Sequence, residues 1–400
     1  MKRNAMRTFL IAAGALMACA APARAADLIG FWDTQQRGAN CFNGRPPEQS
    51  YFEALRAIGG TWVRLAFYKW QGEGRDFLIG NADNYQGLVE SDLAILRATL
   101  DRAHAADVKV VLTPATLPGA RNQQYNDDVF DDRLWSDRAY WEQSAAFWRD
   151  LAAAVKDHPA IAAYNVLNEP APERRGGLDE HIDTETSARW YAQQRRGARD
   201  LRAFYQQVVA AIREADAETP IMLDAGFYGA ADALEHFVAP LEDERILYAF
   251  HMYEPWSATS APNMRREAPY SYPGAAPFGG GLVGWDAARV AAYLQRPVDW
   301  ADANGVARSR LVAGEFGCMR RWVDCPRYLE DVLSVIDDRH GLHWAFYSFR
   351  EDVWDGMNYE LGTGPAGAYW AANEAGRPYA YPEIGENPVF APILSRLAGP

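Results

Sequence analysis

Residues 161–170 read Ile-Ala-Ala-Tyr-Asn-Val-Leu-Asn-Glu-Pro, an apolar run that passes directly into a polar tripeptide. A short apolar run of this kind, bounded by turn-forming residues, is typical of a β-strand. We therefore expect a strand at Ile161–Asn165, with Asn168 and Glu169 just beyond its end. The same arrangement of a short strand followed by a polar loop recurs along the chain.

The chain alternates such runs with amphipathic stretches whose apolar residues stand at helical spacing. The eight expected strands are Gly38–Phe42, Trp62–Ala66, Val108–Thr113, Ile161–Asn165, Ile221–Asp224, Ile246–His251, Arg310–Gly314 and Trp344–Phe349. The expected helices are Tyr51–Ile58, Ser91–Ala106, Tyr140–Lys156, Arg199–Ala215, Ala287–Ala303 and Tyr328–Asp338. Because alternating strands and helices form parallel sheets, the sequence predicts an α/β fold, a single (β/α)₈ TIM barrel.

The N-terminus has the three parts of a secretory leader. Residues 1–7 are basic, residues 8–21 are almost wholly apolar, and residues 23–25 have the small-x-small form of a cleavage site. We expect a signal peptide at 1–25, a catalytic barrel at 26–400, and a periplasmic or secreted protein. Residues 16–19, Leu-Met-Ala-Cys, loosely resemble a lipoprotein cleavage box, so a lipid anchor at Cys19 stays open.

The length beyond the leader exceeds that of a bare barrel and predicts elaborated loops at its top. The longest is the Pro/Gly-rich run Pro255–Gly284, which lacks periodicity and is expected to form one long loop. Asp27–Gln36 is expected to form a small cap at the bottom of the barrel. No segment after the leader is long and apolar enough to span a membrane.

The charge of the chain argues against nucleic acid as a partner. The leader holds four basic residues and no acidic ones, so its removal takes the formal charge from −13 to −17. Such an acidic protein is expected to bind a neutral ligand rather than a polyanion. The histidines form no zinc pattern and no glycine-rich phosphate loop occurs, so we expect neither a metal nor a cofactor.

Three cysteines remain after the leader, namely Cys41, Cys318 and Cys325. Cys318 and Cys325 are close in sequence on one expected loop, which favours a disulfide between them. Pairing of Cys41 with Cys318 is the alternative, because both are expected at the same end of the barrel.

Two glutamates stand where a barrel of this kind places its chemistry, at the carboxyl ends of the strands. Glu169 follows the expected strand Ile161–Asn165, and Glu315 follows Arg310–Gly314 across the barrel mouth. Glycoside hydrolysis needs one carboxylic acid to protonate the leaving oxygen and a second carboxylate at the anomeric carbon. Carboxyl groups about 5 Å apart leave no room for a water between them, which predicts retention of configuration.

Here the chain resembles the family five glycoside hydrolases of clan A, from about Arg37 to Arg350. The matching motifs are Arg-Gly-Ala-Asn at 37–40, Trp-Val-Arg-Leu at 62–65, Asn-Glu-Pro at 168–170, Phe-His-Met-Tyr at 250–253 and Gly-Glu-Phe-Gly at 314–317. The resemblance implies that Glu169 is the acid/base and Glu315 the nucleophile. It further implies supporting roles: Arg64 and Tyr253 orient Glu315, Asn168 contacts the sugar 2-hydroxyl, and His251 lies beside the catalytic pair. A cation and a phenol next to Glu315 would keep it ionised, whereas Glu169 needs a raised pKa.

The chain departs from the family pattern at two strands. Where many members carry a sugar-contacting histidine after the third strand, this chain has Thr113 or Ala115. At the eighth strand Tyr347 stands in place of the sugar-stacking tryptophan, with Trp344 and Phe349 as the alternatives in a shifted register. Further sugar platforms are expected among tryptophans of the top loops: Trp135, Trp256, Trp285, Trp322 and Trp354.

The sequence thus predicts a retaining β-glycoside hydrolase acting on a β-linked polysaccharide or oligosaccharide. A β-glucan is the first choice, because Pro118-Gly-Ala-Arg-Asn122 resembles the corresponding stretch of exo-glucanase-like members. A mannan or an exopolysaccharide is the alternative substrate. A hypothesis of another class is a non-catalytic carbohydrate-binding barrel, suggested by the two departures.

Overall fold

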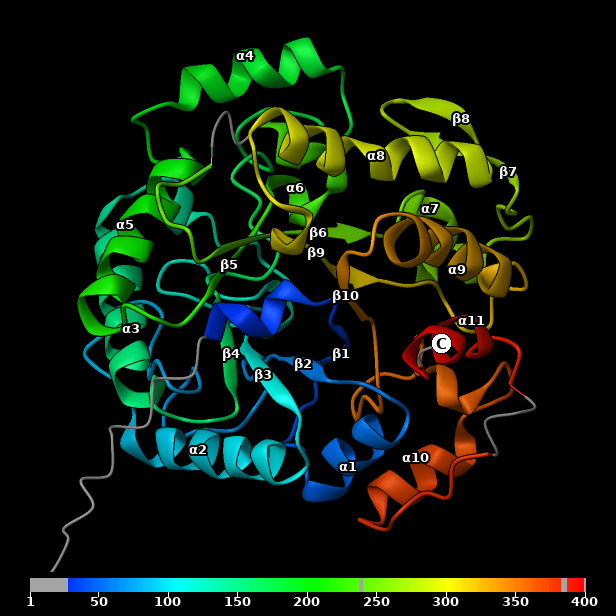
Figure 1. Cartoon of the computed structure of the whole chain (residues 1–400), viewed down its shortest axis with the longest axis horizontal. Helices are drawn as coiled ribbons and strands as arrows, with labels where there is room; N and C mark the ends of the chain where they lie inside the picture. The colour runs from blue at the N-terminus through cyan, green and yellow to red at the C-terminus, as the bar shows by residue number, and fades with distance from the viewer. Residues whose placement is uncertain (1–27, 237–239, 383–386, 399–400) are drawn as a thin grey trace, which may run out of the picture.

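Eight parallel strands close into a barrel in the order β1-β10-β9-β6-β5-β4-β3-β2, as the computed structural model of the chain shows (Figure 1). The strands are β1 Arg37–Cys41, β2 Trp62–Leu65, β3 Lys109–Leu112, β4 Ile161–Asn165, β5 Ile221–Asp224, β6 Ile246–Met252, β9 Leu311–Phe316 and β10 His343–Phe346. Each overlaps one expected strand, so the predicted (β/α)₈ barrel is confirmed. The structure describes residues 28–236, 240–382 and 387–398; the expected leader, 1–25, lies outside them.

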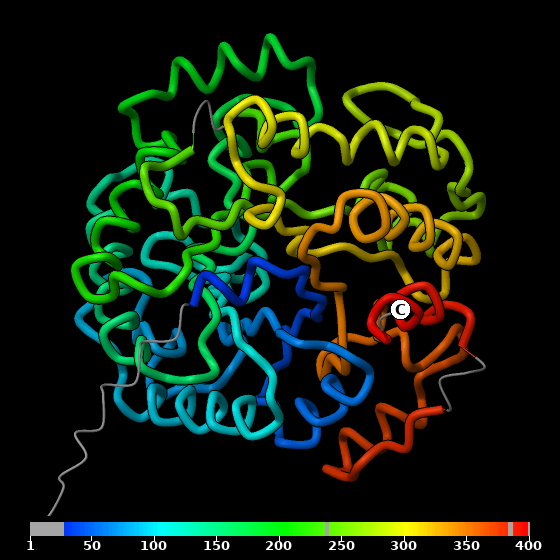
Figure 2. The backbone as a smooth tube through the Cα atoms, viewed as in Figure 1, coloured from blue at the N-terminus to red at the C-terminus, as the bar shows by residue number. Residues whose placement is uncertain are grey.

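Helices surround the barrel, as the backbone trace also shows (Figure 2). Those that match the expected helices are α1 Gln49–Ala57, α2 Glu90–Ala105, α3 Ala139–Val155, α5 Leu201–Ala215, α8 Ala287–Ala303 and α9 Cys325–Leu333. The others are α4 Thr184–Gln194, α6 Gly226–Gly229, α7 Trp256–Thr259, α10 Gly367–Glu374 and α11 Ala391–Leu397. In the described part of the chain, no helix is long and apolar enough to cross a membrane.

The bottom of the barrel is closed by the 3₁₀ helix η1, Leu28–Asp33, as expected for a cap at Asp27–Gln36. Its Trp32 is fully buried and packs edge-on against Trp62 of β2. The Trp32 indole Nε1 donates a hydrogen bond to the carbonyl oxygen of Ala162, 3.1 Å away. These residues belong to a separate apolar cluster that fills the lower interior of the barrel.

The prediction of one long loop at Pro255–Gly284 is wrong. This stretch contains α7, the 3₁₀ helix η5 Ala261–Arg265, and an antiparallel hairpin of β7 Gly274–Phe278 and β8 Gly281–Trp285. Phe278 and Trp285 pack against Tyr293 of α8. The hairpin therefore owes its order to tertiary packing, which the Pro/Gly-rich local sequence does not reveal.

Cys318 and Cys325 form a disulfide in the segment after β9, which is the first of the two pairings that the sequence leaves open. Cys41 is a free thiol on β1 and is buried. Burial raises the pKa of the Cys41 thiol to about 12. The two sulfur sites are thus chemically distinct.

The cap supplies a test of how the barrel is stabilised. Replacing Trp32 by alanine leaves a large cavity in the lower core, and we expect the free energy of unfolding to fall by about 3–5 kcal/mol. Urea denaturation followed by circular dichroism measures this change. Trp256→Ala is the matched control, because that indole is 57% exposed and its loss should change stability by less than about 0.5 kcal/mol. Equal losses from the two variants would contradict a stabilising role for the cap.

Candidate active site

Two glutamates and a histidine meet at the carboxyl ends of the barrel strands. One carboxylate oxygen each of Glu169 and Glu315 and a ring nitrogen of His251 all lie within 4.8 Å of one another. The Glu315 side chain is almost fully buried, whereas about a third (32%) of the Glu169 side chain is exposed. The structure therefore brings together the two glutamates that the sequence singles out, with the less accessible one deeper in the barrel.

Arg64 on β2 holds the deeper glutamate. Its guanidinium is fully buried, and Nη1 donates to Glu315 Oε1 over 2.6 Å and to Asn40 Oδ1 over 2.9 Å. On the other carboxylate oxygen, the Tyr253 hydroxyl donates to Glu315 Oε2 over 2.8 Å. Both oxygens of Glu315 thus accept hydrogen bonds. The two donors, Arg64 and Tyr253, are those expected from the sequence.

The second guanidinium nitrogen of Arg64 reaches toward β4. Arg64 Nη2 donates to Asn165 Oδ1 over 2.6 Å, to Asn168 Oδ1 over 2.9 Å and to Asp224 Oδ2 over 3.3 Å. Asp224, at the end of β5, also accepts from the backbone N–H of Glu169 over 3.1 Å. The sequence analysis does not name Asn165 and Asp224 as site residues. Each is a polar residue at the end of an apolar strand, and that pattern could have identified them.

The chain around Glu169 adopts an unusual backbone conformation. Glu169 has φ 52°, in the left-handed region that non-glycine residues rarely occupy. The backbone N–H of Asn168 donates to Pro114 O over 2.9 Å, so both sides of this turn are anchored. Left-handed residues that the surroundings hold in place cluster at functional sites.

Burial and the surrounding charges set the protonation of the pair. Burial, reinforced by the carboxylate of Asp224, raises the pKa of Glu169 to about 8, while Arg64 opposes the rise. Burial also raises the pKa of Glu315, against the opposing effects of His251, Arg64 and Tyr253. Because the two carboxyl groups lie close together, they cannot both ionise easily, and the shared proton is best placed on Glu169, away from the guanidinium. The two donors that are expected to favour the ionised form of Glu315, Arg64 and Tyr253, are present, and both oppose the effect of burial on its pKa.

His251 on β6 bridges the site. Its Nδ1 lies 3.0 Å from Glu169 Oε1, and its Nε2 lies 3.5 Å from Asp224 Oδ2. Burial lowers the pKa of His251, which favours the neutral ring. A neutral ring adds no charge to the buried site, and its Nδ1 stays within hydrogen-bonding distance of Glu169. Among the described residues, this trio is also the one group spaced to hold a metal ion.

The pair opens into a cavity of about 980 Å³. The predicted residues Asn168, His251, Tyr253, Tyr347 and Trp256 all line this cavity. Trp354 also lines it, whereas the other three expected sugar platforms do not: Trp135, Trp285 and Trp322 are buried in the core. Those three predictions are wrong, because a loop tryptophan that packs under its own loop has the same local sequence as one that faces solvent.

At the end of β10 the structure decides between the register alternatives. Tyr347 lines the cavity, whereas Trp344 is buried and donates from Nε1 to Asp337, and Phe349 is buried in the core. Beside Tyr347 lies a pair that the sequence analysis misses: Lys69 Nζ lies 3.0 Å from Glu351 Oε1, with both side chains almost fully buried in the cavity wall.

After β3, neither Thr113 nor Ala115 lines the cavity, and both are buried. Asn122 lines it on this side instead, at the end of the stretch Pro118–Asn122. The absent histidine thus has no direct substitute at its own position.

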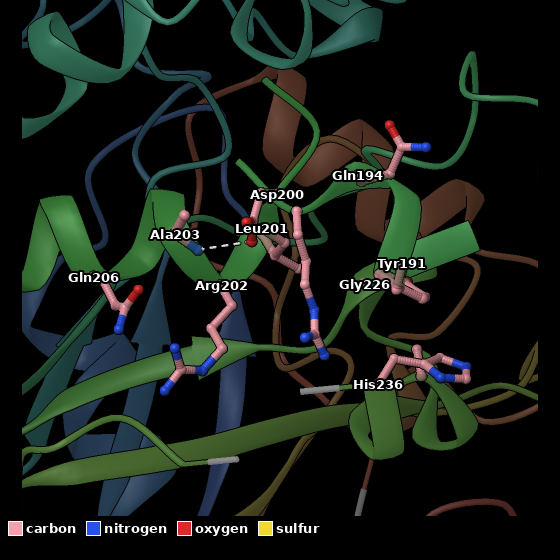
Figure 3. Close-up of a pocket in the computed structure, with 11 residues that line it drawn as sticks. Tyr191, Gln194, Asp200, Leu201, Arg202, Ala203, Gln206, Gly226 and His236 are labelled. Atoms are coloured by element: carbon pink, nitrogen blue, oxygen red, sulfur yellow. Dashed lines mark hydrogen bonds between the residues drawn. The ribbon is translucent and has the colours of Figure 1, made fainter. Parts of the chain in front are cut away.

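A smaller cavity of about 340 Å³ lies on the side of the barrel, between α4, α5 and the 3₁₀ helix η4, Ala231–His236 (Figure 3). Tyr191, Gly226 and His236 lie close together at one side of this pocket, and Asp200 and Arg202 line another part of it (Figure 3). None of the predicted site residues contributes to its lining. The larger cavity, which holds the paired carboxyl groups, is therefore the candidate active site.

A closed (β/α)₈ barrel with two glutamates meeting at the ends of its fourth and seventh strands has the fold and the acidic pair of the barrel glycoside hydrolases. The comparison with protein families agrees. Residues 27–352 match the model described as Cellulase (glycosyl hydrolase family 5), and the chain belongs to this family.

Individual relatives are distant. The chain is 25% identical over 265 residues to a β-xylosidase of Phanerodontia chrysosporium, which covers 62% of this chain and 46% of that protein. It is 24% identical over 208 residues to endoglucanase C of Acetivibrio thermocellus, covering 52% and 50%. The matches thus span about half the length of these relatives.

Solved structures share the fold. A hyperthermophilic endo-β-1,4-glucanase solved with its substrate has a TM-score of 0.61 at 15% identity, over 92% of this chain and 100% of that one. An endoglucanase of Pseudomonas stutzeri solved with cellobiose has a TM-score of 0.58 at 18% identity, over 91% and 92%.

The electrostatics of the site can be tested on Glu254, which follows Tyr253 and whose carboxylate helps to raise the pKa of Glu169. Glu254→Gln removes this negative charge, so we expect the pKa of Glu169 to fall below about 8. Carbon-13 NMR titration of the glutamate carboxyl groups measures the change. Glu185→Gln, on exposed α4, is the control and should leave the pKa of Glu169 unchanged. A rise in that pKa in Glu254→Gln would refute the assigned cause.

Proposed function

We propose that the protein is a retaining β-glycoside hydrolase that acts on a β-linked polysaccharide or oligosaccharide by double displacement. One observation carries this proposal: a carboxylate oxygen of Glu169 lies within 4.8 Å of one of Glu315. Retaining glycosidases have carboxyl groups about 5–5.5 Å apart, whereas inverting ones keep about 6.5–9.5 Å to admit a water.

In the first step, Glu315 attacks the anomeric carbon while Glu169 gives its proton to the leaving oxygen. The bond to the leaving sugar breaks and a covalent glycosyl ester of Glu315 forms. In the second step, the ionised Glu169 takes a proton from a water, which attacks the same carbon and releases Glu315. The exposed third of the Glu169 side chain suits this role, because the proton must pass between the carboxyl group, the leaving group and incoming water.

The neighbouring side chains support these steps. Arg64 and Tyr253 each donate to one oxygen of Glu315. The carboxylate is thereby held in one orientation before the substrate binds, which favours attack. Asn168 accepts from Arg64 through Oδ1, which leaves its amide N–H groups as donors for a sugar hydroxyl. His251, neutral beside Glu169, does not compete for the proton that the leaving group needs.

A β-glucan is the substrate that we favour. Two groups of relatives support it: endoglucanase C among the sequence relatives and the endoglucanases among the solved structures. The β-xylosidase relative, a mannan and an exopolysaccharide mark the range of alternatives. We further propose a periplasmic or secreted location, on the strength of the expected leader at 1–25. The binding-only alternative is less well supported, because Arg64, Tyr253 and Asp224 keep the full set of contacts that a working pair requires.

The roles of the two glutamates can be separated with substrates. Glu169→Ala should lower kcat on an oligosaccharide by about 100- to 10,000-fold, because the leaving sugar then departs without a proton. The same variant should lose less on an aryl glycoside with an acidic phenol, and added azide should restore turnover as a glycosyl azide. Glu315→Gln should abolish hydrolysis of both substrates. Near-normal activity of Glu315→Gln, or an inverted product anomer by proton NMR, would exclude the mechanism.

The pKa of Glu169 predicts the pH dependence. Glu169 must carry its proton to act as an acid, and raising the pH through about 8 removes that proton. We therefore expect kcat/KM on an oligosaccharide to decline on the alkaline side at about pH 8. In Glu169→Ala this alkaline decline should disappear. A wild-type profile that stays flat through this range would contradict the assignment of the acid.

A further inference from the structure

The turn α6, Gly226–Gly229, lies beneath one wall of the active-site cavity. Its two central residues, Phe227 and Tyr228, have φ 46° and 59° and are both in the left-handed region. Left-handed backbone is unfavourable for residues with a Cβ, so the surrounding structure must hold the turn in place. The side chains of Phe227 and Tyr228 both line the cavity that holds the catalytic pair.

A buried carboxylate supports this turn from below. Glu173 is fully buried, and its Oε2 accepts from the backbone N–H of Phe227 over 3.1 Å. Its Oε1 accepts a short hydrogen bond from the hydroxyl of Tyr191 on α4. The packing is close, since a Cβ added to Gly226 would lie 2.3 Å from Glu173 Oε1. Figure 3 shows Tyr191 beside Gly226 at the edge of the side pocket.

The mechanism described above does not use Glu173. In the described part of the chain, its carboxylate makes no ion pair, and neutral donors alone stabilise it. Burying a carboxylate without a cation costs free energy, and its hydrogen bonds offset that cost. The bond from the Phe227 N–H ties Glu173 to the backbone of the turn.

The same turn contacts the residue that follows the acid/base. The backbone N–H of Tyr228 donates over 3.1 Å to the carbonyl of Pro170, the residue after Glu169. At Gly229 the turn also approaches His251, because a Cβ added there would lie 2.9 Å from Cγ of His251. The turn therefore lies between Glu173 on one side and Pro170 and His251 on the other.

Backbone contacts place the turn beside the acid/base rather than beside the nucleophile. The Tyr228 N–H donates to the carbonyl of Pro170, next to Glu169, whereas the Tyr347 N–H donates over 2.9 Å to the carbonyl of Phe316, next to Glu315. Burial raises the pKa of Tyr228 to about 12 against the opposing effect of Arg174, and the carboxylates of Glu180 and Glu169 add to the rise. Because the acid protonates the departing oxygen, the side chains beyond Glu169 are those that face the departing sugar.

We propose that Glu173 is a positioning residue of the leaving-group subsite, which fixes the turn that carries Phe227 and Tyr228 against the departing sugar. The inference rests on the proposed function and deepens it. Aromatic side chains in cavity walls provide flat apolar surface and, in Tyr228, a hydroxyl, which together suit the apolar face and polar edge of a sugar. Glu173 acts through this turn and does not touch the substrate.

The test compares two substrates that share a glycone and differ in the leaving group. Cellobiosyl fluoride leaves a single atom that occupies no sugar subsite, whereas cellotetraose leaves a sugar. Glu173→Gln keeps the shape of the side chain and replaces one acceptor oxygen with an amide donor, and Tyr191→Phe removes one hydroxyl. For both variants we expect kcat/KM on cellotetraose to fall by about tenfold or more, because a small displacement at a subsite has effects of this size. The value on the fluoride should change by less than about threefold.

Tyr164→Phe is the matched control. Tyr164 is also a buried tyrosine that donates to a carboxylate, Asp216, but it does not line the cavity. Its loss should lower the melting temperature and leave the ratio of the two kcat/KM values unchanged.

The experiment distinguishes failure of the positioning role of Glu173 from failure of the proposed function. Equal losses on both substrates in Glu173→Gln and Tyr191→Phe, with the fold retained by circular dichroism, would overturn the positioning role. If Glu173→Gln does not fold, Tyr191→Phe alone decides. A wild-type protein inactive on the fluoride and on a panel of β-glucans, mannans and aryl glycosides would instead refute the proposed function.

Discussion

The buried guanidinium of Arg64 is the interaction on which the site depends. It stands where water does not reach, yet it donates to residues on β1, β4, β5 and β9 and to the loop after β4. Two carboxylates, Glu315 and Asp224, share its single charge. Burying three charges is favourable only when hydrogen bonds satisfy each of them, so the strands that bring these partners must hold their register within a fraction of an ångström. The register of the barrel strands therefore depends on a buried charge as well as on apolar packing.

The cavity has different neighbours beside each of the two glutamates. On one side, Glu315 lies with Tyr347 and the Lys69–Glu351 pair. On the other side, Glu169 lies with the turn at Phe227–Tyr228, and Arg174 and Glu180 also line the cavity near Tyr228. Aromatic surface and charged groups are therefore present on both sides of the paired carboxyl groups.

The sequence predicts the barrel well, because each strand is a short apolar run bounded by turn-forming residues, and Ile161–Asn165 and Ile221–Asp224 match to the residue. It does not predict α4, whose buried residues are only Ser187 and Trp190, too few to give a helical periodicity. The two glutamates are visible because Glu169 follows β4 and Glu315 lies at the end of β9. Glu173 and Glu351 are not, because they lie in loops and their partners, Tyr191 on a later helix and Lys69 near the start of the chain, become apparent only in the folded structure.

The free thiol of Cys41 has a consequence for how the chain acquires its disulfide. Thiol–disulfide exchange needs a thiolate, and a thiol with a pKa of about 12 in the closed barrel supplies almost none at neutral pH. Once β1 is enclosed in the barrel, Cys41 is therefore excluded from exchange with the Cys318–Cys325 disulfide, and the folded chain keeps this one cross-link among its described cysteines.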